Sequence, residues 1–292
     1  MLPALSKIFE KIVHTQLYEY VDINQLLTNK QHGFRKRRST TTALARFTDE
    51  VLNSMEKGQL CGAVVLNLSK AFDTVDHSIL LSKLSNLGVL SCNLLWFESY
   101  LGYRSRRVSC GQDLSSALTI NCGVPQGRIL GPLLFTIYIN DLLSVLDYTN
   151  VSLYADDTVL CHFSSSATDM ESKLNSDLHK LSIWLEKMKP TLNLDKTRFM
   201  IMGSDRKLDK FSHVVLNVMD KEIKQENHMK YLVISISSNM TWSEHIEIIS
   251  SKINQRLGLL IRIKHLLPRQ ARLLYYYSFV LPIFDYADIH VV

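Results

Sequence analysis

Two adjacent carboxylates stand between two apolar segments near the middle of the chain. Asp156 and Asp157 follow residues 151–155 and precede residues 158–161, and apolar side chains dominate both flanks. Such flanks predict two short strands joined by a tight turn. Like charges at a turn repel each other, so the pair needs either water or a cation. A solvated turn, where aspartate is common, and a metal site both fit the dipeptide alone.

The surrounding patterns predict alternating helices and strands. Helices are expected at about 5–20, 42–57, 78–87, 94–101, 132–146, 166–187, 242–264 and 269–280. Strands are expected at 62–68, 106–110, 118–122, on both sides of residues 155–157, and at 193–202. This mixed order, with hairpins, favours an α+β fold over a doubly wound parallel sheet.

Composition excludes several classes of protein. Hydrophobic residues make up 46% of the 292 residues and the formal net charge is +5, which argues against disorder. No apolar run approaches the roughly 18 residues of a membrane span, so no membrane partner is expected. Five cysteines without a C-x-x-C spacing favour a reduced, intracellular setting, in the nucleus or the cytoplasm. No pattern indicates a protein partner.

Three motifs together carry a resemblance to a known family. They are Val-Val-Leu-Asn-Leu-Ser-Lys-Ala-Phe-Asp at 64–73, Gly-Val-Pro-Gln-Gly at 123–127 and Tyr-Ala-Asp-Asp at 154–157. Weaker pieces are Gly-Phe-Arg at 33–35 and Leu-Asn-Leu-Asp-Lys-Thr at 192–197. In this order and spacing they resemble reverse transcriptases of non-LTR (LINE-type) retrotransposons, over nearly the whole chain.

The resemblance implies a right-hand polymerase fold and a templated reaction. Fingers would occupy residues 1–60, a palm with a split βαβ core and the remaining fingers elements 61–237, and thumb-like helices 238–292. The implied reaction adds deoxynucleotides to a primer 3′-hydroxyl with two Mg²⁺ ions, for which Mn²⁺ could substitute. The implied partners are an RNA template, a DNA primer and deoxynucleoside triphosphates.

The same resemblance assigns roles to individual residues. Asp156 and Asp157 match the metal ligands, and Lys196 matches the lysine that protonates the leaving pyrophosphate. Three further residues match the nucleotide-binding set: Arg35 for the triphosphate, Phe72 for exclusion of a ribose 2′-hydroxyl, and Gln126 for the nascent base pair. Plain core packing for Phe72 and a solvated lysine for Lys196 are the alternatives.

Basic residues are expected to bind the nucleic acid. They lie in the dense cluster after Gly33 and along the closing helices, with a loop glycine added: Lys36, Arg37, Arg38, Gly127, Arg256 and Arg262. Such contacts go to phosphates and are independent of base sequence. A solvated basic loop is the alternative for the first cluster.

Asn67 departs from the family pattern, which has an aspartate there as the first metal ligand. A neutral amide binds a hard dication more weakly than a carboxylate does. Arg128, in place of a small residue, and Val233, in place of glycine, depart as well. With a start inside a segment that usually has protein before it, these changes suggest a truncated, drifting retrotransposon copy. The second hypothesis is therefore a catalytically impaired polymerase-fold remnant that at most binds nucleic acid.

Overall fold

The computed structural model describes residues 4–102, 104–111, 113–125, 127–211 and 213–286. The helices are α1 Ala4–Ile23, α2 Thr40–Glu56, α3 His77–Asn86, α4 Ser91–Leu101, α5 Gly131–Tyr138, α6 Ala167–Met188, α7 Asp205–Leu208, α8 Ser243–Ile263, α9 Arg269–Tyr275 and α10 Leu281–Asp285. A 3₁₀ segment, η1, covers Asn140–Val145 and a π segment, η2, covers Tyr276–Val280. Within these residues no helix is both long enough and apolar enough to cross a membrane.

The strands are short apart from two long central ones. They are β1 Leu60–Ser69, β2 Arg104–Arg106, β3 Ser109–Cys110, β4 Asp113–Leu114, β5 Leu118–Ile120, β6 Asn150–Tyr154, β7 Asp157–Ser164, β8 Thr191–Leu192, β9 Arg198–Met202, β10 Asn217–Val218, β11 Lys221–Glu222, β12 Lys224–Gln225, β13 His228–Tyr231 and β14 Ile234–Ser237. The main sheet has the order β12-β9-β1-β7-β6, and β8 extends it by pairing with the end of β1. Strand β1 pairs antiparallel with both β7 and β9, which explains its apolar sequence.

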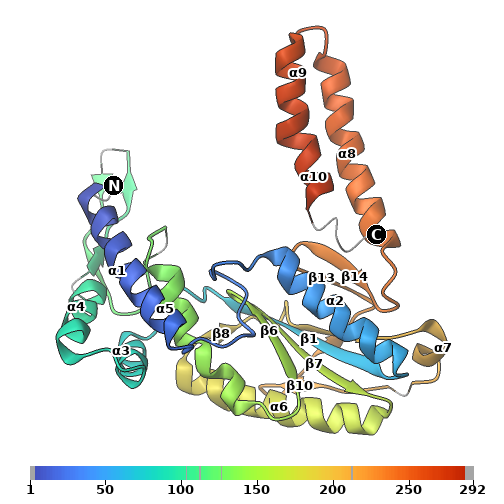
Figure 1. Cartoon of the computed structure of the whole chain (residues 1–292), viewed down its shortest axis with the longest axis horizontal. Helices are drawn as coiled ribbons and strands as arrows, with labels where there is room; N and C mark the ends of the chain where they lie inside the picture. The colour runs from blue at the N-terminus through green and yellow to red at the C-terminus, as the bar shows by residue number, and fades with distance from the viewer. Residues whose placement is uncertain (1–3, 103, 112, 126, 212, 287–292) are drawn as a thin grey trace.

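Alternation along β1 separates two hydrophobic cores. Val64, Leu66 and Leu68 belong to the larger core, which α3, α5 and α6 share. Cys61 and Ala63 belong to the second core, which lies under α2 and the β13–β14 hairpin. Because successive side chains of a strand point to opposite faces, the odd-numbered positions of β1 face α2. Figure 1 shows α2 on one side of the sheet and α6 on the other.

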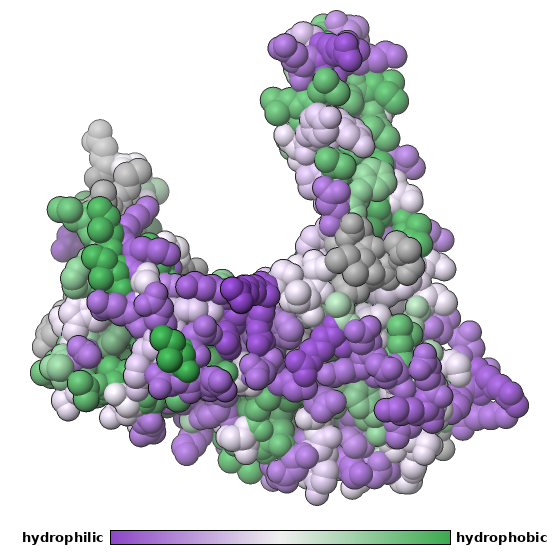
Figure 2. All heavy atoms as spheres, in the orientation of Figure 1, coloured by the Kyte–Doolittle hydropathy of each residue, from purple (hydrophilic) through white to green (hydrophobic). Residues whose placement is uncertain are grey.

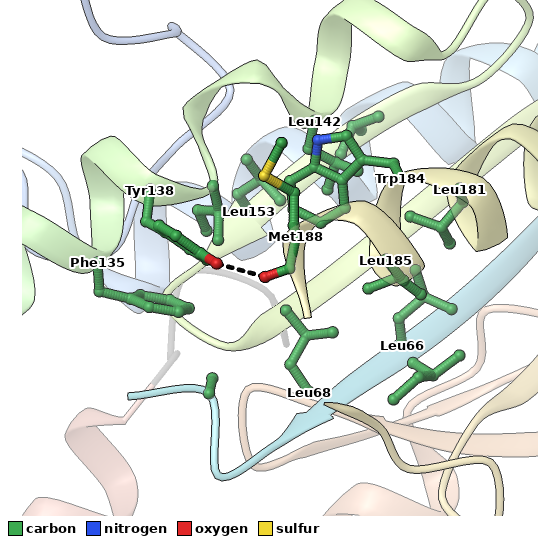
Figure 3. Close-up of a cluster of buried hydrophobic side chains, with 14 of the residues drawn as sticks. Leu66, Leu68, Phe135, Tyr138, Leu142, Leu153, Leu181, Trp184, Leu185 and Met188 are labelled. Carbon is green, nitrogen blue, oxygen red and sulfur yellow. Dashed lines mark hydrogen bonds between the residues drawn. The ribbon is translucent and has the colours of Figure 1, made fainter. Parts of the chain in front are cut away.

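The larger core continues to the ends of α5 and α6. Figure 3 shows Tyr138 at the end of α5 beside Leu153 and Met188, with its hydroxyl donating to the Met188 carbonyl. That carbonyl belongs to the last turn of α6, where backbone oxygens lack helical partners. Lys189 follows with a φ of +63° and ends the helix. A single buried hydroxyl therefore joins α5 to the point where α6 stops.

The structure corrects four expected elements. The strand expected over 106–110 is two short strands, β2 and β3, which pair with β5 and β4 respectively. The helix expected over 132–146 ends at Tyr138 and continues as a 3₁₀ segment, because the Asn140 side chain bonds the Leu26 carbonyl and the Thr28 amide. The strand expected over 193–202 begins only at 198, after a turn. The final helix expected over 269–280 changes into a π segment at Tyr276. The other expected helices and the hairpin around residues 155–157 are present.

The two ends of the chain form separate projections from the sheet. Helices α1, α3 and α4 gather at one side, and α8 to α10 rise as an antiparallel helical hairpin at the other (Figure 1). The Tyr286 hydroxyl donates to the Leu232 carbonyl at 2.6 Å and anchors the end of this hairpin to the β13–β14 turn. The sheet lies between the two projections.

Candidate active site

The two acids lie at the tip of the β6–β7 hairpin. Tyr154 pairs with Asp157, which leaves Ala155 and Asp156 as a two-residue turn. Ala155 has a φ of +55°, in the left-handed region that costs a residue with a Cβ about 1–2 kcal/mol. The Asp156 carbonyl accepts from the Leu68 amide at 3.4 Å, which joins the turn to β1. The backbone therefore holds both acids beside the end of the central strand.

Asn67 lies directly opposite Asp157. The register of β1 against β7 pairs these two residues, and directly opposed side chains of an antiparallel pair are about 4.5–5.5 Å apart at their Cβ atoms. Both occupy the face of the sheet that α2 covers further along. The structure thus brings Asn67, Asp156 and Asp157 together at one end of the central strands, as the sequence predicts.

The electrostatics at this end of the sheet favour a cation. Burial raises the pKa of the Asp157 carboxyl, the charge of Asp156 raises it further, and a hydrogen bond with the Asn67 side chain lowers it. Burial and like charge both penalise the ionised form, and a nearby cation would offset them. Without one, Asn67 is the group that partly stabilises the Asp157 carboxylate.

The donor set suits a hard divalent cation but lacks one acid. Carboxylate and amide oxygens are the ligands that Mg²⁺ accepts in proteins. Among the described residues, no group of three or more His, Cys, Asp or Glu side chains could hold a metal ion. Asp156 and Asp157 together balance the charge of one dication and leave a second without a protein counter-charge. Asn67 is the position that would supply the third acid.

Lys196 lies on a turn that is bonded to Asn67. The Asn193 amide donates to the Asn67 carbonyl at 2.9 Å, and the Lys196 amide donates back to the Asn193 carbonyl at 3.1 Å. Strand β8, just before this turn, pairs with the end of β1. The Lys196 side chain is exposed. Its assigned role in proton transfer stays a prediction, on a loop held beside the acids.

The basic cluster after Gly33 divides into bonded and exposed residues. The Arg35 guanidinium donates to the Thr28 carbonyl and to Asp22, both at 3.2 Å. Arg38 donates to the Asn29 carbonyl at 2.6 Å and the Gln31 carbonyl at 2.8 Å. Both arginines therefore hold the loop that follows α1. A triphosphate contact by Arg35 stays a prediction that requires these bonds to rearrange.

Lys36 and Arg37 are the exposed members of that cluster. The Lys36 ammonium lies 4.9 Å from the centre of the Tyr18 ring, and its amide donates to the Tyr18 hydroxyl. Arg37 has a φ of +60°, and its side chain makes no hydrogen bond or ion pair within the described residues. These two side chains are the ones that a phosphate backbone could reach without breaking existing bonds.

Phe72 packs between the connection that joins α1 to α2 and helix α5. Its ring centre lies 6.0 Å from that of Phe34 and 4.5 Å from that of Phe135. Its carbonyl accepts from the Val124 amide at 2.7 Å, so residues 123–125 lie against it. Core packing therefore accounts for part of the role of Phe72, and its selection of deoxynucleotides stays a prediction. Gln126 lies outside the described residues, and Gly127 is exposed with a φ of +72°.

The two arginines that are expected to bind nucleic acid from the closing helices differ in their surroundings, because one is bonded within the protein and the other is exposed. The Arg256 guanidinium donates to the Phe279 carbonyl, and the Arg256 carbonyl accepts from the Tyr275 hydroxyl at 3.1 Å. Phe279 belongs to the π segment η2, where helical hydrogen bonding is irregular. Arg256 therefore joins α8 to the returning helix, whereas Arg262 is exposed in the last turn of α8.

Sequence reasoning missed two residues with side chains bonded at the site's edges. The Gln31 side chain accepts hydrogen bonds from Gly33 and Ala155. Glu10 binds Arg128 in the loop before α5. Ala155 is 124 residues from Gln31 and Arg128 is 118 residues from Glu10, so no local spacing could have signalled these two contacts. A glutamine between two basic residues and a glutamate on an amphipathic helix look like ordinary surface residues.

The chain is similar in sequence to known reverse transcriptases. A sequence model described as reverse transcriptase (RNA-dependent DNA polymerase) matches residues 1–236. The RNA-directed DNA polymerase from mobile element jockey of Drosophila melanogaster is 30% identical over 253 residues, covering 84% of this chain and 27% of that protein. The probable RNA-directed DNA polymerase from transposon BS of the same organism is 28% identical over 304 residues, covering 98% of this chain and 32% of that protein.

A solved structure resembles the chain as well. Telomerase from Candida tropicalis, in complex with a fragment of telomeric RNA, aligns with a TM-score of 0.56 at 12% identity and covers 99% of this chain and 45% of that one. At such identity the likeness shows the fold alone, which is the α+β right-hand polymerase fold expected from the sequence. The chain spans about a third or less of the two curated relatives' length.

Proposed function

Because the chain belongs to the reverse transcriptase (RNA-dependent DNA polymerase) family, we propose that it performs RNA-directed DNA synthesis. The substrates would be deoxynucleoside triphosphates, a primer 3′-hydroxyl and an RNA template. The observation that carries this proposal is the pair Asp156 and Asp157 at a hairpin tip, opposite position 67 of the central strand. Residues 1–60 would serve as fingers, 61–237 as palm with the remaining fingers elements, and 238–292 as thumb.

In this proposal Asp156 and Asp157 hold Mg²⁺, with the Asn67 amide oxygen as a weaker third donor. When bound, the ions would activate the primer hydroxyl and neutralise the phosphates. Lys196, on its exposed turn beside Asn67, would protonate the departing pyrophosphate. Phe72 would lie under the sugar of the incoming nucleotide, and Arg35 with Gln126 would contact its triphosphate and base pair.

Asn67 favours a second candidate function, which is nucleic-acid binding without turnover. Replacing one carboxylate by an amide leaves the shape of the site and removes one charge. Loss of a single preorganised electrostatic group commonly lowers a rate by about 10²- to 10³-fold. Loss of a ligand that both ions share should lower the rate by at least as large a factor. The fold would then bind template and primer while extension is very slow.

Asn67→Asp separates the two candidates. The experiment compares the unmodified 292-residue chain, Asn67→Asp and the double variant Asn67→Asp/Asp157→Asn in extension of a DNA primer on an RNA template. We expect Asn67→Asp to raise the extension rate by about 10²-fold or more. The double variant should return it to the starting level. Mn²⁺ affinity, measured by calorimetry, should rise in Asn67→Asp and fall again in the double variant.

Thermal unfolding supplies a second readout. Three converging carboxylates repel each other, so Asn67→Asp should lower the melting temperature without a divalent cation and recover it when Mn²⁺ is added. Measurable extension at equal rates by the unmodified chain and Asn67→Asp would rule out binding without turnover. If neither protein extends the primer and neither binds the hybrid, the polymerase proposal is wrong.

A further inference from the structure

The segment just before the basic cluster is joined to the hairpin that carries the acids. The Leu153 amide donates to the Lys30 carbonyl at 3.0 Å, and the His32 amide donates to the Leu153 carbonyl at 2.7 Å. Gln31 and Leu153 form a parallel bridge, so residues 30–32 extend the sheet beyond β6. Leu153 precedes Ala155 by two residues and Asp156 by three, and the junction lies on the side of the turn away from β1.

The Gln31 side chain lies inside this junction. The residue is 1% exposed, and its Oε1 accepts from the Gly33 amide at 2.8 Å and from the Ala155 amide at 3.4 Å. The shorter bond orients the side-chain amide, and the longer one reaches the turn. Ala155 is the residue with positive φ immediately before the two acids. One buried oxygen therefore bonds the backbone on both sides of the junction.

Gly33 makes this close approach possible. A Cβ at this position would lie 2.4 Å from the Ala155 nitrogen, a distance that real side chains do not adopt. Backbone of the 30–33 segment thus touches backbone of the turn without an intervening side chain. The acceptor for the Ala155 amide has to come from nearby, and Gln31 supplies it from the core.

We propose that Gln31 is a positioning residue, which fixes the Ala155–Asp157 turn and so aims the two carboxylates at position 67. Gln31 lies outside the donor set and touches no substrate in this role. The consequence for metal binding rests on the proposed function, whereas the effect on the turn does not. The alternative is that Gln31 only orders its own loop through the Gly33 amide.

Hydrogen exchange of the 292-residue chain, measured without divalent cations, tests the role in the turn. Gln31→Met keeps the size of the side chain and removes the acceptor. We expect exchange in the peptide covering 150–160 to accelerate about tenfold in Gln31→Met, with α6 unchanged, because local opening of the turn becomes easier.

Val51→Ala is the matched control, because Val51 is fully buried in α2 and contributes to the second core without bonding the turn. It should lower the melting temperature and leave exchange in 150–160 unaltered. Equal exchange in Gln31→Met and Val51→Ala would overturn the proposal. Should Gln31→Met fail to fold, Gln31→Asn withdraws the same oxygen by one methylene and should show the same acceleration.

Mn²⁺ affinity provides the second readout. Residues that orient metal ligands typically change affinity by about 10- to 100-fold when mutated, and we expect about tenfold weaker binding in Gln31→Met. Val51→Ala should bind Mn²⁺ as the unmodified chain does. If the unmodified chain binds no Mn²⁺, the proposed function fails, while the exchange comparison still decides the role of Gln31.

Discussion

The turn between β13 and β14 carries backbone strain at one exposed side chain. Tyr231 pairs with Ile234, which leaves Leu232 and Val233 as a two-residue turn, with φ values of +47° and +73°. Positive φ at both central positions is the geometry that glycine and asparagine adopt most readily. Val233 is β-branched and 73% exposed, so no packing compensates for the strain. The departure from glycine noted in the sequence therefore falls where glycine is needed.

Val233→Gly should raise the free energy of unfolding by about 1 kcal/mol, because relief of the left-handed strain exceeds the added flexibility of the unfolded chain. Chemical denaturation measures the change, and the melting temperature should rise by a few degrees. Val108→Gly is the control, since Val108 is 67% exposed and has no positive φ. A gain of equal size in both variants would show that turn geometry is not its source.

At the scale of elements, α1 is joined to the loop before α5 by an ion pair at the core boundary. The Arg128 guanidinium contacts the Glu10 carboxylate at 2.6 Å, and the Ile129 amide donates to the same carboxylate at 3.2 Å. Glu10 is 2% exposed, so its charge depends on these donors. From the sequence alone, Arg128 looks like a sign of drift. In the structure it has a defined partner.

Arg128→Ala should lower the free energy of unfolding by about 3–5 kcal/mol, because it leaves the Glu10 carboxylate buried without its counter-charge. The double variant Glu10→Gln/Arg128→Met should lose much less, since neither charge is then left alone. Urea unfolding of both variants measures the difference. Equal losses would mean that packing of the arginine, rather than its charge, holds α1 in place.

Elements with a clear local period were predictable, and those shaped by distant contacts were not. Strand β1 and helix α6 follow from an apolar run and an amphipathic period. The helix after Pro132 breaks because the Asn140 side chain bonds residues of the α1–α2 connection, which no local pattern reveals. The convergence of Asn67 with the two acids could be expected from the family motifs. The contacts of Gln31 and Glu10 depend on tertiary structure alone.

At the scale of the whole molecule, the distribution of charge matters more than its sum. The formal net charge is only +5. Figure 2 shows a hollow between the α1 side and the α8–α10 hairpin, with a largely hydrophilic floor. Lys36 and Arg37 are exposed in the connection between α1 and α2, and Arg262 is exposed on α8. If a duplex lies in this hollow, these side chains would contact phosphates on its two flanks.

Removing two of these charges should change the salt dependence of binding to an RNA–DNA hybrid. Each phosphate contact contributes about 0.7–0.9 to the slope of log affinity against log salt. Lys36→Gln/Arg37→Gln should therefore weaken binding and reduce the slope by about one to two. Fluorescence anisotropy over a salt series measures both, and the effect should not depend on base sequence.

Lys210→Gln/Lys221→Gln removes the same total charge from exposed positions after α7 and on β11, near the opposite edge of the sheet. Because exposed charges separated by more than about 8–10 Å are screened at physiological salt, this control should leave the slope unchanged. Equal reductions by the two double variants would mean that binding responds to net charge rather than to the hollow. A loss confined to Lys36→Gln/Arg37→Gln would locate the phosphate backbone beside the segment that Gln31 and Gly33 attach to the Ala155–Asp157 turn.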